Sequence, residues 1–237
     1  LVSLLWSPAW ALSGLILSAN YWPAYNDNNP AGGSNYQGQN SEQAAAGKTA
    51  WQSRAPWYCT PGPSTMVCHL TQALMDQDIQ MAQAGGVTNF AFYWTGAQAG
   101  GVNFQYSAAY QQAWDLYQSS AENTRVQWTL NLRIPFFGAS PFSDTAQWHA
   151  NVDQLVAYMG QSTYQKMGAN RPMLYVFYVA TDVTSWFAGS TANVKTATDY
   201  IRSQAIVAGL GNPYIVFQGI GAGATAATTL TTLGGDA

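Results

Sequence analysis

Hydrophobic and polar positions follow one another along this chain in repeated blocks, each a helix-length amphipathic segment followed by a short apolar run. The clearest block spans residues 75–94. Its first part carries apolar residues at i, i+4 and i+7, the spacing of one helix face: Met75, Ile79 and Ala82. Gly85 and Gly86 then predict the end of that helix. The run 87–94 is too apolar for a strand with one wet face, so it indicates a parallel strand covered on both faces.

The same alternation continues along the chain. Strands are predicted at residues 15–22, 87–94, 126–134, 173–180 and 214–220. Further helices are predicted at residues 106–118, around Trp148 to Met159, from Val194 to Ala208, and at 222–233. Regular alternation of this kind predicts a parallel sheet with right-handed crossovers. Gly235 and Asp236 resemble the start of a sixth strand.

The expected fold is an α/β (β/α)8 TIM-type barrel, incomplete at its C-terminus, in a single domain over residues 1–237. Such barrels have eight units and typically about 250 residues. Five to six units fill the 237 residues here, because residues 26–66 form a long first βα loop rich in Asn, Gly, Ser, Gln and Pro. An open sheet is the alternative. If the barrel is incomplete, its open edge after the fifth strand is expected to be covered either by another chain or by further residues of the same protein.

The composition is unusual in its lack of charge. Charged residues make up 8% of the chain, against roughly 25% in an average soluble domain, whereas aromatic residues make up 14%. The net charge of −3 provides no basic field, which argues against a nucleic-acid partner. A surface of Trp, Tyr, Asn and Gln suits neutral sugars with apolar C–H faces. It equally suits a secreted protein with an uncharged surface, and the two interpretations are compatible.

Two cysteines, Cys59 and Cys68, flank a segment with two prolines and a glycine that can fold back on itself. We predict a disulfide between them and therefore an oxidising, extracellular compartment. The alternative is a pair of buried free thiols. Residues 1–18 are mostly apolar but are interrupted by Pro8 and Gly14, so we expect no membrane span.

No metal site or cofactor is expected. The two histidines, His69 and His149, lack neighbours at metal-ligand spacing. No phosphate loop, nucleophile elbow or dinucleotide fingerprint is present in the sequence.

Several segments of the chain resemble one known family. The motif Asp78-Ile79, Ala82, Gly85, Val87, Phe90-x-Phe92-Tyr93-Trp94 is similar to the second βα unit of the endo-α-mannosidase-like glycoside hydrolases, family ninety-nine and its relatives. Looser matches follow the same order along the chain: Tyr21-Trp22-Pro23-Ala24-Tyr25, Val126 to Asn131, Tyr164 to Tyr178, and Gly234-Gly235-Asp236-Ala237. The resemblance implies a (β/α)8 barrel that hydrolyses α-linked mannose or related sugars at the carboxyl ends of its strands.

The catalytic residues implied by the resemblance do not map onto this sequence. In the family they are glutamates of an Asn-Glu-Trp-x-Glu motif beyond the position of Ala237, and Glu42 and Glu122 do not match it. Glycoside hydrolysis requires two carboxyl groups roughly 5–10 Å apart. Asp236 is a weak catalytic candidate near the family's Asp-Ala step. Asp27 and Asp182 follow predicted strands, where capping or solvation explains them equally well.

Polar and aromatic side chains at the predicted strand ends are the candidate substrate-binding residues, because rings stack on sugar C–H faces and amides bind hydroxyls. Packing inside a barrel is the alternative role for the large ones. The candidates are Tyr21, Trp22, Tyr25, Tyr93, Trp94, Asn131, Arg133, Tyr178 and Gln218.

The sequence thus predicts an extracellular carbohydrate-active protein, a glycoside hydrolase acting on α-linked mannose-type or related glycans. The alternative is a non-catalytic glycan-binding or surface-structural protein on the same barrel. Either way the expected partner is an oligosaccharide or polysaccharide.

Overall fold

The fold is known from a computed structural model of the chain. It describes residues 16–21, 59–61, 66–68, 70–94, 107–132, 145–168, 170–178, 183, 187–220 and 224–237. Its strands are β1 (Ser18–Tyr21), β2 (Cys59–Pro61), β3 (Met66–Cys68), β4 (Asn89–Trp94), β5 (Gln127–Leu132), β6 (Lys166–Met167), β7 (Arg171–Phe177) and β8 (Tyr214–Gln218). Its helices are α2 (Gln72–Ala84), α3 (Ser107–Ser119), α4 (Thr145–Met159), α6 (Thr191–Val207) and α7 (Ala224–Leu233).

Five strands form a parallel sheet in the order β1-β4-β5-β7-β8, so each strand lies beside the next parallel strand along the chain. The short β6 pairs antiparallel with the start of β7. After α7 the backbone returns to β8: the amide of Ala237 donates to the carbonyl of Ile215, and the amide of Phe217 donates to the carbonyl of Ala237. That bond pattern is the one that parallel strands make, so residues 235–237 lie beside β8 where the sequence predicts a sixth strand to start, although they form no regular strand.

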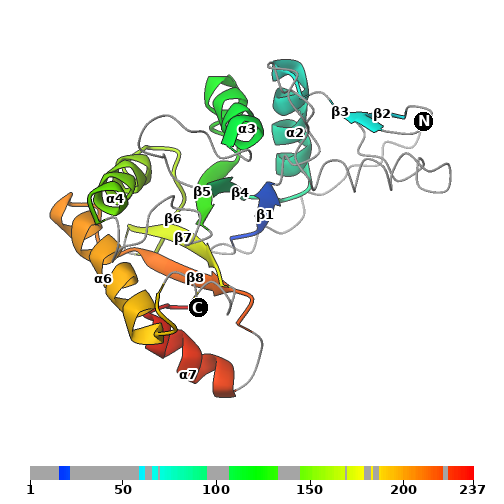
Figure 1. Cartoon of the computed structure of the whole chain (residues 1–237). Helices are drawn as coiled ribbons and strands as arrows, with labels where there is room; N and C mark the ends of the chain where they lie inside the picture. Colours follow the sequence, from blue (N-terminus) through cyan, green and yellow to red (C-terminus); the bar gives the residue numbers. More distant parts are fainter. Residues whose placement is uncertain are drawn as a thin grey trace, which may run out of the picture.

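The helices cover one face of this sheet. Figure 1 shows α2, α3, α4, α6 and α7 following one another around the outer side of the strands. Right-handed crossovers that always step in the same direction across a sheet place every helix on the same face. The main hydrophobic core lies between these two layers and contains the buried rings of Phe92, Tyr117, Trp128 and Trp148.

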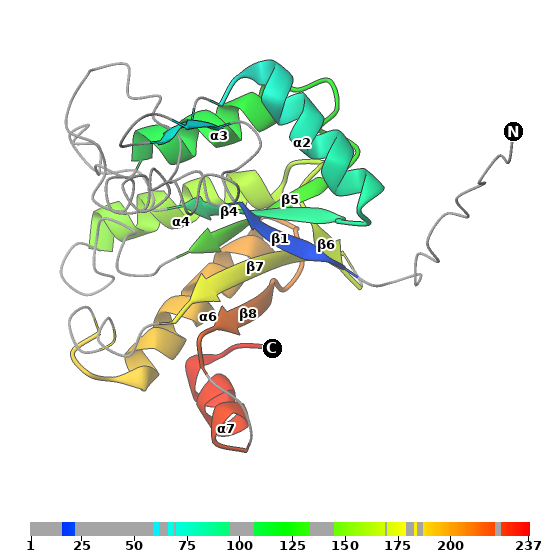
Figure 2. The same cartoon turned by 90° about the vertical axis from the view of Figure 1, so that its right-hand side faces the viewer.

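The opposite face of the sheet is concave. The hydroxyl of Tyr175 on β7 donates to Ser18 Oγ on β1 at 2.8 Å, across the intervening β4 and β5. In a flat sheet, strands three places apart are separated by roughly 14 Å, which a Tyr and a Ser side chain cannot span. The sheet therefore curls away from its helices, like part of a barrel wall. Figure 2 shows this sheet from the side, with β5 and β7 running in the same direction.

The predicted α/β class, with helices alternating with parallel strands, is confirmed, and each predicted helix and strand of the sheet has an observed counterpart. A closed eight-stranded barrel stays a prediction. Two antiparallel features were missed: the hairpin of β2 and β3, at the end of the predicted long loop, and the pairing of β6 with β7. Strands of two or three residues are too short to show a hydrophobic period.

None of the helices in the described ranges is both long enough and apolar enough to serve as a membrane span.

Candidate functional site

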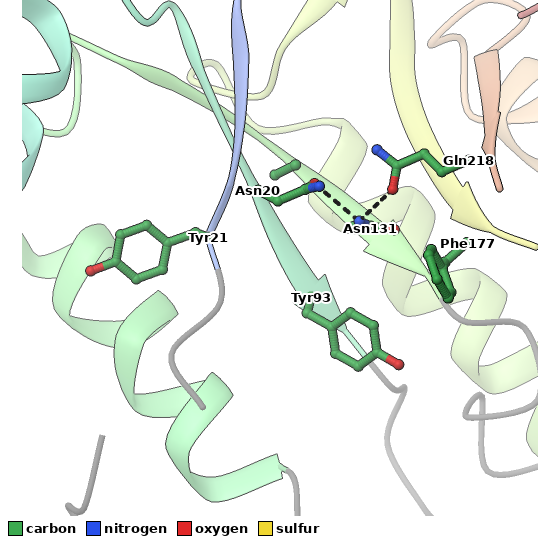
Figure 3. Close-up of a pocket in the computed structure, with 7 residues that line it drawn as sticks. Asn20, Tyr21, Tyr93, Asn131, Phe177 and Gln218 are labelled. Atoms are coloured by element: carbon green, nitrogen blue, oxygen red, sulfur yellow. Dashed lines mark hydrogen bonds between the residues drawn. The ribbon is translucent and has the colours of Figure 1, made fainter. Parts of the chain in front are cut away.

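A cavity of about 230 Å³ opens on the concave face at the carboxyl ends of the parallel strands. It receives residues from β1, β4, β5, β7 and β8, so the whole parallel sheet contributes to it (Figure 3). The carboxyl ends of parallel strands are where α/β proteins commonly bind ligands. The lining residues are Asn20, Tyr21, Ala91, Tyr93, Asn131, Phe177 and Gln218.

The two-residue period of a strand decides which side chains reach the cavity. On β4, Phe90 and Phe92 pack into the core beneath the helices, which leaves Ala91 and Tyr93 on the concave face. On β5 and β8 the same alternation turns the apolar residues next to Asn131 and Gln218 toward the helices. Asn131 and Gln218 themselves then face the cavity.

Asn131 connects the polar side chains of the cavity through hydrogen bonds. Its Nδ2 donates to Asn20 Oδ1 at 3.1 Å and to Gln218 Oε1 at 2.9 Å. Figure 3 shows Asn20 and Gln218 meeting Asn131 from different strands. This chain of three amides links β1, β5 and β8 across the concave face. It fixes side chains that would otherwise be free to rotate at the strand ends.

Deeper on the concave face, a small apolar cluster contains buried Ala91, Met173 and Tyr175, with Ile16 and Val216 packed against it. Because interiors of this kind are close-packed, the cluster gives the strand ends above it a stable base. The side-chain amides of the cavity therefore project from strands of the sheet, whose backbone is fixed by this packing.

The chemistry of the lining is that of a binding site for an uncharged polar ligand. Asn20, Asn131 and Gln218 offer amide groups, Tyr93 and Phe177 offer ring faces, and Phe177 is 42% exposed. None of the seven lining residues carries a charge at neutral pH. These residues can hydrogen-bond and stack, but they provide no acid–base pair.

The structure gathers three of the predicted binding residues, Tyr93, Asn131 and Gln218, around the cavity. Tyr21 also borders it, but its hydroxyl donates to Asp78 Oδ2 of α2 at 2.8 Å, and Figure 3 shows its ring directed away from Asn131. A role of Tyr21 in stacking on a ligand is not supported by that orientation.

Two other candidates lie on the helix-covered face. Trp94 packs edge-on against Tyr158 of α4, with ring centroids 5.7 Å apart. Tyr178 packs against Phe217, at 6.5 Å. Both belong to the margin of the main core, so the core-packing alternative describes them better. The candidates Trp22, Tyr25 and Arg133 lie outside the described residues.

Sequence reasoning missed Asn20 and Phe177. The strand period shows that each of them, standing immediately before a chosen residue, Tyr21 or Tyr178, points to the opposite face, but it does not show which face bears the cavity. Choosing the last aromatic residue of a strand selected the wrong face. Only knowledge of which face the helices cover could have corrected that choice.

Asp236, the weak catalytic candidate, lies at the amino-terminal ends of the parallel strands, whereas the cavity lies at their carboxyl ends. Its Oδ2 accepts from the amide of Ile215 at the start of β8, and its carboxylate is bound by Arg171 at 2.7 Å and Arg202 at 2.6 Å. Ile215 and Arg171 lie at the amino ends of β8 and β7, away from the carboxyl ends that line the cavity. The structure therefore separates Asp236 from the cavity, and its surroundings are those of a structural ion pair.

The pKa of the Asp236 carboxyl is lowered from its usual range. Burial alone would raise this pKa, but hydrogen bonds from Arg202, the Ile215 amide and Arg171 outweigh burial. A carboxyl whose pKa is depressed by folding stabilises the protein above its unfolded-state pKa. That contribution is lost as the pH falls through the folded-state pKa.

We expect Asp236→Asn to lower the free energy of unfolding by about 1–2 kcal/mol at pH 7, because it leaves two arginines without their anion. The difference between variant and wild type should shrink as the pH falls below about 4, where the unfolded aspartate takes up its proton. Urea denaturation at pH 7 and at pH 3 measures both values. An equal difference at the two pH values would contradict this role for the ion pair.

Of the other acidic residues weighed as catalytic groups, Glu122 is the one that the structure describes. Glu122 pairs with Arg125 in the turn between α3 and β5, at the amino end of that strand. Asp27, Asp182 and Glu42 lie outside the described residues. Within the described part of the chain, no three His, Cys, Asp or Glu residues gather closely enough to hold a metal ion.

Comparison of the chain with protein-family models, with curated proteins and with solved structures finds no match in any of the three. The fold and the cavity define a class: an α/β protein with a singly wound parallel sheet, helices on one face, and a small uncharged cavity at the carboxyl ends of the strands.

Proposed function

We propose that this protein is an extracellular carbohydrate-active protein that binds a neutral glycan of the α-linked mannose type in the cavity at the strand ends. The supporting observation is the combination of Asn131, Asn20 and Gln218 amides with the exposed ring of Phe177 in one uncharged cavity. Sugars need both features, because hydroxyls form hydrogen bonds and C–H faces stack on rings.

The size of the cavity fits a short ligand segment. Pockets for drug-sized ligands measure roughly 300–1,000 Å³, and this one measures about 230 Å³. A single sugar ring is the unit that such a space suits. The rest of an oligosaccharide would extend from the mouth.

The binding proposal is tested by titration calorimetry with a neutral α-linked manno-oligosaccharide. Phe177→Ala should weaken binding about three- to tenfold, the loss expected for one stacked ring. Because Phe177 is 42% exposed, the fold should survive this change. Met81→Ala is the matched control: Met81 is 44% exposed on α2, and its removal should leave affinity unchanged.

Absence of binding to neutral glycans at millimolar concentration would contradict the proposal. Equal affinity of Phe177→Ala and wild type would contradict the placement of the site.

Hydrolysis is the second part of the proposal, and it rests on the resemblance to family ninety-nine. It needs two carboxyl groups, and since the lining contains none, they would come from outside the described residues. Release of reducing ends from an α-linked manno-oligosaccharide measures this activity directly. Binding without release supports the non-catalytic alternative, a glycan-binding protein.

The proposed extracellular location rests on the predicted disulfide. The backbone of the β2–β3 hairpin pairs Cys59 directly with Cys68. Residues paired across antiparallel strands have Cα atoms about 4.5–5.5 Å apart, which is within the range that a disulfide needs. We expect non-reduced protein to resist thiol alkylation at both positions in mass spectrometry. Alkylation without reduction would contradict both the bridge and its support for secretion.

A further inference from the structure

The three amides of the cavity have a defined direction. Asn131 uses both hydrogens of Nδ2, one toward Asn20 Oδ1 and one toward Gln218 Oε1, while its own buried Oδ1 has no hydrogen-bond partner within the described structure. Reversing all three amides would instead bury two N–H groups of Asn131 without acceptors. Proteins tolerate an under-satisfied carbonyl more readily than orphaned N–H groups. The observed direction is therefore the favoured one.

This direction leaves hydrogen-bond donors for the ligand. Asn20 and Gln218 each turn their oxygen to Asn131, so their NH₂ groups are directed elsewhere. Within the described part of the chain, neither NH₂ group donates to another protein atom, and neither is buried without a partner. Asn20 is exposed and Gln218 is half-buried, and both line the cavity. Solvent or a ligand must accept from them.

We infer that the cavity recognises a sugar edge through its acceptor oxygens, with Asn20 and Gln218 as the donors and Asn131 as the residue that positions them. This inference rests on the proposed function and adds the polarity of recognition to it. The preferred ligand presents two hydroxyl or ring oxygens as acceptors. A uronate carboxylate is disfavoured, because the lining offers no cation to compensate for the loss of its hydration.

Gln218→Glu tests the donor role. A glutamate keeps the shape of the side chain and an oxygen for Asn131 Nδ2, but at pH 7 it removes the donor. We expect the neutral manno-oligosaccharide to bind at least about tenfold more weakly. The variant loses one hydrogen bond to the ligand, and the carboxylate oxygen repels the ligand oxygen that accepted this bond. Affinity should recover in part as the pH falls toward about 4, where the new carboxyl takes up a proton. Wild-type affinity should change little over that range.

Asn131→Asp tests the positioning role. The carboxylate can no longer donate to Asn20 and Gln218, so their amides turn and use their NH₂ groups to bind it. We expect at least about tenfold weaker binding, measured well below the unfolding transition. The unfolding temperature should also fall, because the 6% exposed side chain would place a carboxylate in surroundings that offer no cation. Calorimetry with a neutral manno-oligosaccharide and with an oligouronate separates the ligand classes.

The outcomes distinguish this inference from the proposed function. If Phe177→Ala weakens binding while Gln218→Glu and Asn131→Asp do not, glycan binding stands and the donor inference is wrong. Tighter binding of the oligouronate than of the neutral glycan also overturns the inference. If wild type binds no neutral glycan, the proposed function itself fails.

Discussion

Trp128→Ala is expected to lower the free energy of unfolding by about 3–5 kcal/mol, the cost of removing a large buried ring. Trp128 on β5 is 0% exposed. Its ring packs against Trp114 and Tyr164, with centroids 5.5 and 4.9 Å away, and its Nε1 donates to Thr163 Oγ1 at 3.1 Å. The substitution therefore leaves a cavity between the sheet and its helices.

Urea denaturation at neutral pH measures the effect. Trp128→Phe is the matched variant: it keeps an aromatic ring but loses the indole N–H and part of the volume, so we expect a loss of about 1–2 kcal/mol. Met81→Ala, on the exposed surface of α2, should fall within about 0.5 kcal/mol of wild type. A loss below about 1 kcal/mol for Trp128→Ala would contradict the central place of this ring in the core.

Gly219→Ala is expected to destabilise the protein by roughly 2–4 kcal/mol, through backbone strain and overpacking together. Gly219 follows β8 with φ of +91°, and a Cβ there would lie 2.9 Å from the carbonyl oxygen of Tyr178. The two segments are held together because the Tyr178 amide donates to the carbonyl of Gln218 at 2.8 Å. The backbone must therefore move to admit a methyl group.

Gly86→Ala is a matched control for this prediction. Gly86 has φ of +82°, but a Cβ built there meets no atom within 4 Å, so its substitution should cost only the strain of about 1–2 kcal/mol. The difference between the two variants isolates the contact with Tyr178. Equal losses in thermal or urea unfolding would show that this contact is relieved without cost. Because Gly219 is next to Gln218, its substitution should also weaken glycan binding.

Local periodicity was enough to predict the order and type of the main elements. The residues Met75 and Ile79 are buried on one face of α2, as their spacing predicts. The apolar runs are the parallel strands. These strands need apolar residues on both faces, because helices cover one face and the curvature of the sheet buries side chains on the other. The short strands β2, β3 and β6 lack such a signal, since they depend on pairing with a neighbour.

The candidate site could be predicted only in part. Asn131 and Gln218 were found because polar side chains at the ends of apolar strands are conspicuous in the sequence. Between Tyr93 and Trp94 the sequence shows no preference, although alternation allows only one of them to face the cavity. The position of α4 decides this, because Trp94 packs against Tyr158 of that helix.

The sequence by itself determined the alternation of helices and parallel strands, and the uncharged, aromatic-rich chemistry available to a ligand. Both depend on residue identity and on spacing along the chain. The tertiary structure decided which side chains share the cavity. It also decided that Asp236 pairs with Arg171 and Arg202 at the amino-terminal ends of the strands, away from the cavity. The physical reason is that strand direction, helix cover and sheet curvature arise from contacts between residues far apart in the sequence. The bonds from Asn131 to Asn20 and Gln218 are contacts of that kind.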